Sequence, residues 1–240
     1  MNSDFDNRHI VVTGGAGSLG TAVVQALLDS GARCSVPCYD KREASSFDLI
    51  DRDEVFTLSP VDLTDEKQSS SFFNSAVEEQ GDLWASVHIA GGFGMGAIED
   101  TPLSDFERQW RMNTVTCYNA CRTAVALMRS SSHKGGRIVN IASRPALEPR
   151  QGKGMTAYTV AKAGVAALTE SLAAEVVKDE ILVNALAPSI IDTPANRKAM
   201  PDADYDQWPK PEQLAQQIRY LVSPRNTVTR GAVIPVYGKS

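Results

Sequence analysis

The chain has 240 residues, of which 42% are hydrophobic and 22% are charged, a balance typical of one globular domain covering residues 1–240. No apolar run approaches the roughly 20 residues that a membrane span needs, and residues 1–8 are too polar for a secretory signal. The net charge is −5 and the basic residues are scattered, which excludes a nucleic-acid surface, so we expect a cytoplasmic protein with a small-molecule partner.

Short apolar, β-branched runs alternate with stretches of helical periodicity along the whole chain. The predicted strands are 9–13, 33–39, 55–58, 84–89, 137–142, 182–187 and 232–236. Strands separated by helices need right-handed crossovers and form a parallel sheet that is covered on both faces. The sequence therefore predicts an α/β fold with a doubly wound, Rossmann-like parallel sheet in a three-layer α/β/α arrangement.

The helices differ in length and in the number of faces that carry apolar residues. A first helix is predicted over 19–30, and two long ones over 104–129 and 156–178. The long helices are apolar on more than one face, so they pack either against another subunit or within the monomer. Residues 192–211 carry four prolines and several charges, which predicts a mobile excursion over the sheet.

A glycine turn joins the first strand to the first helix, with the pattern Gly15-x-Gly17-x-x-Gly20. Glycines at these positions permit the tight turn, the approach of a pyrophosphate to the helix N-terminus, and close packing of helix on strand. The candidate cofactor-binding residues of the turn are Gly14, Gly15, Gly17, Ser18, Leu19 and Gly20. The pattern indicates a dinucleotide site, and the alternative is a glycine-rich turn without a ligand.

The end of the second strand offers groups that could meet the adenosine ribose. Asp40 lies about 20 residues beyond the last glycine, where a carboxylate can accept from the ribose hydroxyls. Lys41 and Arg42 follow it and could instead neutralise a 2′-phosphate. We expect NAD or NADP, with a preference for NAD, and the alternative is that all three residues are ordinary surface charges.

Tyr158 and Lys162 lie four residues apart in the opening turns of a predicted helix, which places them on one face. A tyrosine with a pKa of about 10 is a poor acid or base, and a neighbouring ammonium is expected to lower that pKa. Ser143 follows a predicted strand, so its hydroxyl should emerge at the carboxyl edge of the sheet, where it could hold a carbonyl oxygen. The alternative is an amphipathic helix pair without chemistry.

Together these motifs resemble the short, single-domain branch of the short-chain dehydrogenase/reductase family over nearly the whole chain. The matching segments are 13–20, 61–63, 88–91, Asn113, Ser143, Tyr158 with Lys162, and 188–193. The resemblance implies an NAD(P)-dependent oxidoreductase that moves a hydride between nicotinamide and a carbonyl or secondary alcohol, with Tyr158 as general acid or base. It also implies a homotetramer. A non-catalytic nucleotide-binding regulator and an NAD-retaining epimerase or dehydratase stay open as alternatives.

The resemblance also implies residue roles. Asp62 would bind the adenine amine, Ser143 would orient the substrate, and Lys162 would hold the nicotinamide ribose. Asn113 would support a water-linked proton relay through Lys162. The implied catalytic set is Asn113, Ser143, Tyr158 and Lys162. The implied cofactor contacts beyond the glycine turn and Asp40 are Asp62, Leu63, Ala90, Gly91, Tyr158, Lys162, Pro188, Ile191 and Thr193.

The sequence departs from the family pattern at three places. Ser18 stands where the short branch has its middle glycine, a spacing that also fits the longer epimerase branch. His88 and Ile89 replace two asparagines, and we interpret His88 as a buried structural residue. Ser143 and Tyr158 are about two residues further apart than is common, which predicts a longer loop over 144–155. This loop and 192–211 should determine the substrate.

The remaining polar candidates give no sign of a second site. The cysteines form two pairs spaced by three residues, Cys34 with Cys38 and Cys117 with Cys121, and no histidine is near either pair in the sequence. A zinc site needs more ligands at closer spacing, so we expect buried, reduced thiols and no metal. His9 and His133 have no evident partner in the sequence.

Overall fold

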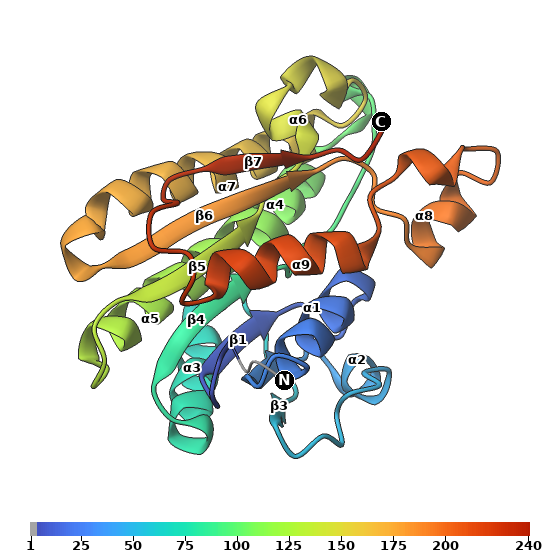
Figure 1. The fold of residues 1–240 in the computed structure, drawn as a ribbon. Helices are drawn as coiled ribbons and strands as arrows, with labels where there is room; N and C mark the ends of the chain where they lie inside the picture. Colours follow the sequence, from blue (N-terminus) through green and yellow to red (C-terminus); the bar gives the residue numbers. More distant parts are fainter. Residues whose placement is uncertain (1–3) are drawn as a thin grey trace.

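The computed structural model describes residues 4–240, in which strands and helices alternate as the sequence predicts (Figure 1). The strands are β1 (His9–Thr13), β2 (Arg33–Pro37), β3 (Val55–Leu58), β4 (Leu83–His88), β5 (Gly136–Ile141), β6 (Ile181–Pro188) and β7 (Val233–Val236). The helices are α1 (Ser18–Leu28), α2 (Lys41–Ser45), α3 (Glu66–Gln80), α4 (Leu103–Trp110), α5 (Thr116–Ser130), α6 (Arg144–Leu147), α7 (Thr156–Glu175), α8 (Pro194–Ala199) and α9 (Pro211–Val222).

All seven predicted strands are confirmed within two residues at each end, and they form one parallel sheet in the order β3-β2-β1-β4-β5-β6-β7. The order reverses between β1 and β4, because the chain first builds outward to β3 and then returns to the other side of β1. The loops after β1 and β4 therefore diverge at the carboxyl edge and leave a crevice between them. This is the doubly wound arrangement that the sequence predicts.

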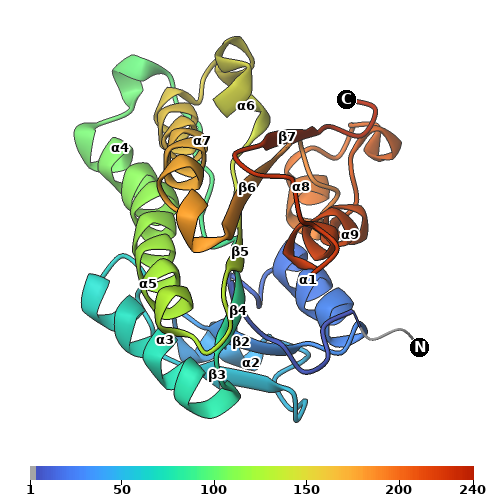
Figure 2. The same cartoon turned by 60° about the vertical axis from the view of Figure 1, so that its left-hand side comes forward.

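Helices cover both faces of the sheet and make three layers (Figure 2). On one side α3, α5 and α7 enclose a core that contains Phe72, Phe73 and Ile138, while α1 and α9 enclose a second core with Leu27 and Ile218. All five side chains are fully buried. Burial of one such side chain stabilises the fold by roughly 1.5–3 kcal/mol, so these cores hold the sheet and its crevice in shape. In residues 4–240, no helix is both long and apolar enough to span a bilayer.

The predicted helix 104–129 is interrupted at its centre. A π-helical turn, Arg111–Val115, separates α4 from α5. The Thr116 hydroxyl donates to the Met112 carbonyl at 2.9 Å, and the Asn113 side chain bonds outside the helix, so polar side chains compete with the regular backbone pattern here. The prediction of one uninterrupted helix was wrong, and the interruption sets the direction of Asn113.

Two segments predicted as irregular contain helices. Residues 144–155 form α6 and a 3₁₀ turn, and residues 192–211 contain α8, which lies beyond the end of β6. Thr193 accepts from the Asn196 amide at the start of α8, and Trp208 is only 7% exposed. Local capping and an anchoring aromatic ring therefore order parts of these segments.

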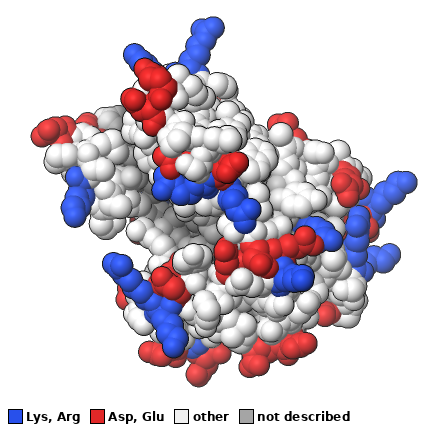
Figure 3. Space-filling model, turned by 180° about the vertical axis from the view of Figure 1, so that it is seen from behind, with Lys and Arg blue, Asp and Glu red and all other residues white. Residues whose placement is uncertain are grey.

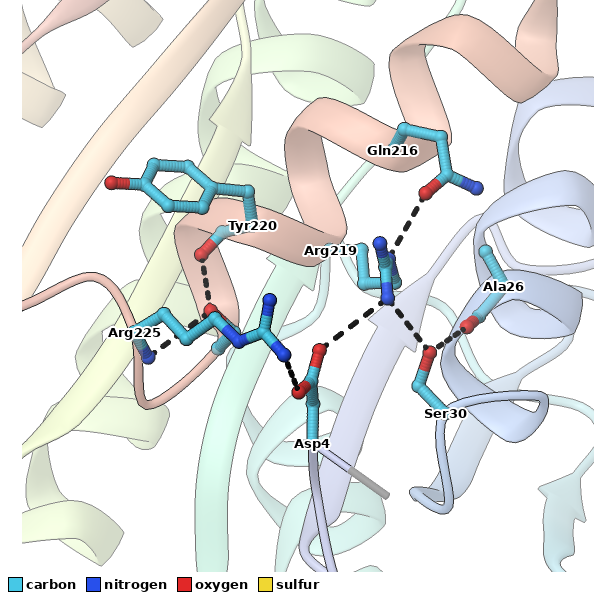
Figure 4. Close-up of polar contacts among 8 residues, drawn as sticks. Asp4, Ala26, Ser30, Gln216, Arg219, Tyr220 and Arg225 are labelled. Carbon is cyan, nitrogen blue, oxygen red and sulfur yellow. Dashed lines mark hydrogen bonds and ion pairs between the residues drawn. The ribbon is translucent and has the colours of Figure 1, made fainter. Parts of the chain in front are cut away.

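The start of the described chain is tied to the C-terminal half (Figure 4). The Asp4 carboxylate accepts from Arg225 at 2.7 Å and pairs with Arg219 of α9 at 3.4 Å. Arg219 also donates to the Ser30 hydroxyl at 3.3 Å, just beyond α1. Because the Asp4 side chain is only 12% exposed, the attraction is less screened than in an ordinary surface pair.

His9, for which the sequence suggests no partner, is buried at the start of β1 with both ring nitrogens bonded. Nδ1 lies 2.8 Å from the Gly81 carbonyl oxygen, and Nε2 lies 2.8 Å from the Ser35 hydroxyl. A carbonyl can only accept, so Nδ1 carries the proton and Nε2 accepts from Ser35. Burial lowers the pKa of His9 from 6.5 to about 4 and keeps the ring neutral.

We expect His9 to make the fold less stable in acid. In the unfolded chain this group takes up a proton below pH 6.5, whereas in the fold it does so only near pH 4. The neutral ring therefore contributes fully to the stability of the fold above pH 6.5. This contribution is lost progressively as the pH falls to about 4, by about 3 kcal/mol in the free energy of unfolding. Urea unfolding of the wild type and of His9→Gln should diverge over this window, and parallel pH profiles would contradict the assignment.

Candidate functional site

The glycine turn sits at the crevice, and its glycines are required by close backbone approaches. Gly14 has a φ of +67°, and a Cβ there would lie 2.7 Å from the Ala90 nitrogen. A Cβ on Gly20 would lie 2.0 Å from the Gly14 carbonyl oxygen. Gly17 caps α1 without a side-chain hydrogen bond, so the first amides of the helix have no side-chain acceptor from their cap. These amides and the positive end of the helix dipole form an anion-binding corner.

A cavity of about 780 Å³ extends from this corner along the carboxyl edge of the sheet. Figure 3 shows a hollow in this region with both signs of charge around it, and the charged residues that line the cavity are Glu43, Asp62, Glu107, Arg108 and Arg111. The predicted cofactor residues that line the cavity are Gly14, Gly17, Ser18, Leu19, Gly20, Asp62, Leu63, Ala90, Gly91 and Thr193. The predicted residues Gly15, Asp40, Tyr158, Lys162, Pro188 and Ile191 do not line it.

Near the end of β2, Glu43 of α2 lines the cavity and Asp40 does not. The Asp40 carboxylate accepts from the Glu43 amide at 2.8 Å and caps α2, which directs it away from the cavity. The Glu43 carboxylate lines the cavity and accepts from the Tyr39 amide at 2.5 Å. Lys41 and Arg42 do not line the cavity. An acidic residue three positions after a capping aspartate is a helix-start pattern, and this signal could have identified Glu43 from the sequence.

Asp62 and Arg111 close the opposite wall of the cavity. The Asp62 carboxylate accepts from the Thr64 amide at 2.8 Å, which fixes its direction, and the Asp62 amide donates to the Gln68 side chain at 3.0 Å. Arg111 donates to the Thr64 hydroxyl at 3.3 Å. No sequence motif marks Arg111, which begins the π-helical turn and lines this wall.

Gly91 separates the cavity from Asn113 and Lys162. A Cβ on Gly91 would lie 2.5 Å from Asn113 Oδ1 and 3.6 Å from Lys162 Nζ. The Asn113 side-chain amide donates to the Gly92 carbonyl at 2.9 Å and accepts from the Gly92 amide at 3.2 Å. Asn113 therefore holds the loop after β4 in place, and the absence of a side chain at Gly91 leaves only the main chain between the cavity and the lysine.

Lys162 is buried, and its ammonium is held by the main chain. Nζ donates to the Ile141 carbonyl at 2.8 Å and lies 6.0 Å from the centre of the Tyr158 ring. Burial lowers the pKa of Lys162 to about 8, and the nearby Cys117 opposes this shift. The predicted proximity of Lys162 and Tyr158 is confirmed, at a distance that leaves a gap between the amine and the ring.

The Tyr158 phenol faces Ser143, which follows β5 at the carboxyl edge as the sequence predicts. Burial raises the pKa of Tyr158, and the Ser143 hydroxyl offsets part of the rise. The sequence predicts a lowered pKa, and that prediction is wrong for this structure because desolvation of the phenol outweighs the influence of a lysine 6.0 Å away. Ser143 Oγ is buried, and its only neighbouring partner among residues 4–240 is the Tyr158 phenol, to which it makes no well-aligned hydrogen bond.

Two exposed apolar side chains lie near the segment that leads into α7, one of them against the Tyr158 ring, and no sequence pattern marks either. The Phe93 ring meets the Tyr158 ring edge-on, with centroids 5.0 Å apart, and is itself 59% exposed. Met95 is 66% exposed and lies near Gly154 of the segment before α7. An apolar entrance thus adjoins a polar corner made by Ser143 and Tyr158, which suits a substrate with one polar reacting group.

The chain matches the short chain dehydrogenase family over residues 8–204. The chain belongs to this family. The matched range contains the glycine turn, Ser143, Tyr158 and Lys162. As a short-chain dehydrogenase, the protein is an NAD(P)-dependent enzyme that transfers a hydride between nicotinamide and a carbonyl or alcohol.

Curated relatives of this short-chain dehydrogenase match it over almost their full length. Galactitol 2-dehydrogenase of Rhizobium johnstonii is 31% identical over 247 residues, covering 97% of this chain and 94% of the relative. A 3-oxoacyl-[acyl-carrier-protein] reductase of Chlamydia muridarum is 28% identical, covering 99% of both chains. These relatives are named dehydrogenases and reductases, which favours net hydride transfer over the regulator and epimerase alternatives.

Solved structures share the fold of this short-chain dehydrogenase. The crystal structure of gox2181 superposes with a TM-score of 0.90 at 27% identity, covering 99% of this chain and 98% of the other. The 3-ketoacyl-(acyl-carrier-protein) reductase of Brucella melitensis complexed with NADH superposes with a TM-score of 0.86 at 22% identity, covering 98% of both chains. The second structure shows the shared fold alone.

Proposed function

We propose that this protein is an NAD-preferring dehydrogenase or reductase in which Ser143 and Tyr158 hold the oxygen of a carbonyl or secondary alcohol. The observation that carries this proposal is the Ser143 hydroxyl, which is buried beside the phenol of Tyr158 and has no partner in hydrogen-bond geometry among residues 4–240 other than that phenol. A buried hydroxyl without a partner costs free energy, so this arrangement is suited to a polar atom of a ligand.

The glycine turn and Gly91 give the cavity the space and the backbone amides that a dinucleotide needs. Gly17 and Ser18 leave backbone amides open to a pyrophosphate, and Asp62 is placed to accept from an adenine amine. Gly91, Thr193 and Lys162 would border the nicotinamide and its ribose. When bound, the nicotinamide donates or accepts the hydride.

The phenol of Tyr158 carries the proton step. Its raised pKa keeps it protonated at neutral pH, so it can donate to the oxygen of a carbonyl that is being reduced. Lys162, with a pKa of about 8, keeps much of its positive charge at neutral pH and favours the phenolate that remains. Asn113 positions the loop at Gly91 and Gly92, and we propose that a water-linked path through Lys162 returns the proton.

The preference for NAD rests on Glu43. Its carboxylate lines the cavity, whereas Lys41 and Arg42 do not, so a 2′-phosphate there would meet a negative charge without a facing cation from α2. We propose no narrower substrate class than carbonyls and secondary alcohols. The names of the relatives cover galactitol, 3-oxoacyl groups and hydroxysteroids, which share only this reacting group.

A panel of ketones, assayed with NADH and with NADPH, tests the function and the cofactor preference together. We expect Glu43→Gln to shift the NADH-to-NADPH ratio of kcat/KM toward NADPH by about tenfold, the effect of removing about 1.4 kcal/mol of repulsion. Asp40→Asn is the matched control, because asparagine also caps a helix and this side chain does not line the cavity. An equal shift in both variants, or in Asp40→Asn alone, would contradict the role of Glu43.

We also propose a cytoplasmic homotetramer in which one domain, 1–240, holds both the cofactor and the substrate residues. Exposed apolar side chains on the long helices support assembly, namely Leu103, Trp110, Tyr118 and Val160. The four cysteines are buried and unpaired, as the sequence predicts, which suits a reducing compartment. Light scattering that finds a monomer would refute the tetramer.

A further inference from the structure

A cluster of metal-ligating side chains is buried between the sheet and α5. His88 at the end of β4 meets Cys117 and Cys121 of α5, and the three ligand atoms lie within 4.8 Å of one another. The cysteines are one helical turn apart, so both thiols face the same strand. In residues 4–240, no other group of three such side chains gathers this closely.

Asn140 on β5 adds a fourth atom that could bind a metal, its side-chain carbonyl oxygen. Its Oδ1 lies 2.8 Å from His88 Nδ1 and 3.5 Å from Cys121 Sγ, and Cys121 Sγ lies 3.4 Å from His88 Nδ1. Zinc bonds of about 2.3 Å to sulfur and about 2.0–2.2 Å to nitrogen or oxygen give tetrahedral edges of roughly 3.3–3.8 Å, of which a sulfur-to-nitrogen or sulfur-to-oxygen edge is about 3.6 Å. The distances from Cys121 Sγ to His88 Nδ1 and to Asn140 Oδ1 fit these edges. The 2.8 Å between His88 Nδ1 and Asn140 Oδ1 has to lengthen by about half an ångström.

Neighbouring side chains hold these donors in direction. The Ser86 hydroxyl lies 2.7 Å from His88 Nε2, on the side of the ring away from the cysteines. The Asn140 amide donates to the Thr169 hydroxyl at 2.9 Å, which turns its oxygen toward His88. Ser86, Asn140 and Thr169 are all fully buried. A metal-bound histidine needs such a partner on its second nitrogen, and a ligating carbonyl oxygen gains from a fixed orientation.

We propose that His88, Cys117, Cys121 and Asn140 form a closed, four-coordinate site for a thiophilic divalent cation, zinc or cadmium. On binding, both cysteines coordinate as thiolates and any proton that they carry is released to solvent, while the histidine proton moves from Nδ1 to Nε2, from which it is donated in a hydrogen bond to the Ser86 hydroxyl. No group is oxidised or reduced. Two thiolates balance the charge of the cation, so the dry interior holds no net charge.

The fold accounts for why the sequence predicts no metal here. Twenty-eight residues or more separate His88 from either cysteine, and only the pairing of β4 with β5 and the packing of α5 on β4 bring the four donors together. The cation would tie α5 to two central strands, which gives it a structural role distinct from the proposed hydride transfer. The proposed function therefore stands whether or not the site binds metal.

Cadmium is the probe that tests the site, because thiolate ligation gives an ultraviolet charge-transfer band. Metal-free protein is titrated in the native state and is also refolded from urea with cadmium present, since the site is closed. We expect about one bound cadmium per chain with the thiolate band, and a melting temperature that rises with zinc. Cobalt substitution should give the intense visible bands of a tetrahedral site. If neither the native nor the refolded wild type shows the cadmium band, the proposal is overturned.

Variants separate this site from other thiols. The double variant Cys34→Ala, Cys38→Ala removes the other cysteine pair and should bind cadmium like the wild type. Cys121→Ala should lose the band, and His88→Asn, which installs the residue typical of the family, should lose the zinc-dependent rise in melting temperature. Ser86→Ala should weaken cadmium binding by about 10- to 100-fold. The proposed ligands would be wrong if Cys121→Ala still bound cadmium, or if the variant without Cys34 and Cys38 did not.

Discussion

Replacement of Tyr158 by phenylalanine is expected to lower kcat/KM by at least about 10²-fold while leaving nucleotide affinity nearly unchanged. The phenol supplies the proton in the proposed reaction, and general acid–base catalysis typically contributes 10²–10⁴-fold. Tyr158 does not line the cavity, so its hydroxyl adds little to the binding of the dinucleotide. Steady-state rates with NADH and an active ketone, together with nucleotide titration by fluorescence, measure the two effects separately.

Tyr220→Phe is the matched control for this experiment. Tyr220 lies on α9, is 47% exposed, and removal of its hydroxyl should leave both quantities at the wild-type level. A Tyr158→Phe enzyme that keeps a tenth of the wild-type kcat/KM would refute the role of the phenol. Ser143→Ala should reduce kcat/KM as well, because the carbonyl oxygen then loses one of its two donors.

The second large effect is expected at Gly20, where alanine should destabilise the fold although it is the better helix former. A helical glycine replaced by alanine normally gains about 1 kcal/mol. Here the added Cβ would stand 2.0 Å from the Gly14 carbonyl oxygen and 2.6 Å from the Gly15 Cα, and both are backbone atoms that cannot rotate away. We expect a net loss of about 3 kcal/mol and a melting temperature lower by roughly 6–12 °C.

Gly17→Ala is the partner of that experiment and should have the opposite profile. Its Cβ would meet only the Gly14 carbonyl oxygen, at an ordinary 3.5 Å, so thermal stability should stay near the wild-type value. Gly17 is exposed to the cavity, and a methyl group there holds a pyrophosphate away from the amides of α1. Nucleotide affinity should fall by at least about tenfold. If Gly20→Ala and Gly17→Ala had the same melting temperature and the same nucleotide affinity, the assignment of Gly20 to packing and of Gly17 to nucleotide binding would be wrong.

The fold could be predicted from the sequence because its signals are local. Runs such as His9–Thr13 have the β-branched composition of buried parallel strands, and the glycines that follow report a tight turn. Helical order in 144–155 and 192–211 was missed, since α6 and α8 are short and begin with proline near their first turn. Such helices depend on caps and on anchors like Trp208, which carry little periodicity.

Where the surroundings of the candidate site residues differ from what the sequence predicts, the differences have a common cause. Asp40 and Glu43 are three residues apart, and the choice between them depended on which carboxylate caps α2. The pKa of Tyr158 depended on how deeply the ring is buried, which the spacing to Lys162 does not report. Contacts of His88 with the cysteines arise from strand register. Each error concerned the tertiary surroundings of a residue whose position along the chain was read correctly.

The packing of α1 against α9 has a consequence for how the protein can be made. These helices lie nearly two hundred positions apart in the chain, yet they share one apolar core (Figure 2). While the chain is being synthesised, the apolar face of α1 stays exposed to solvent until α9, close to the last residues of the sequence, has left the ribosome. Stalled or prematurely terminated products would therefore be prone to aggregate and should depend on chaperones.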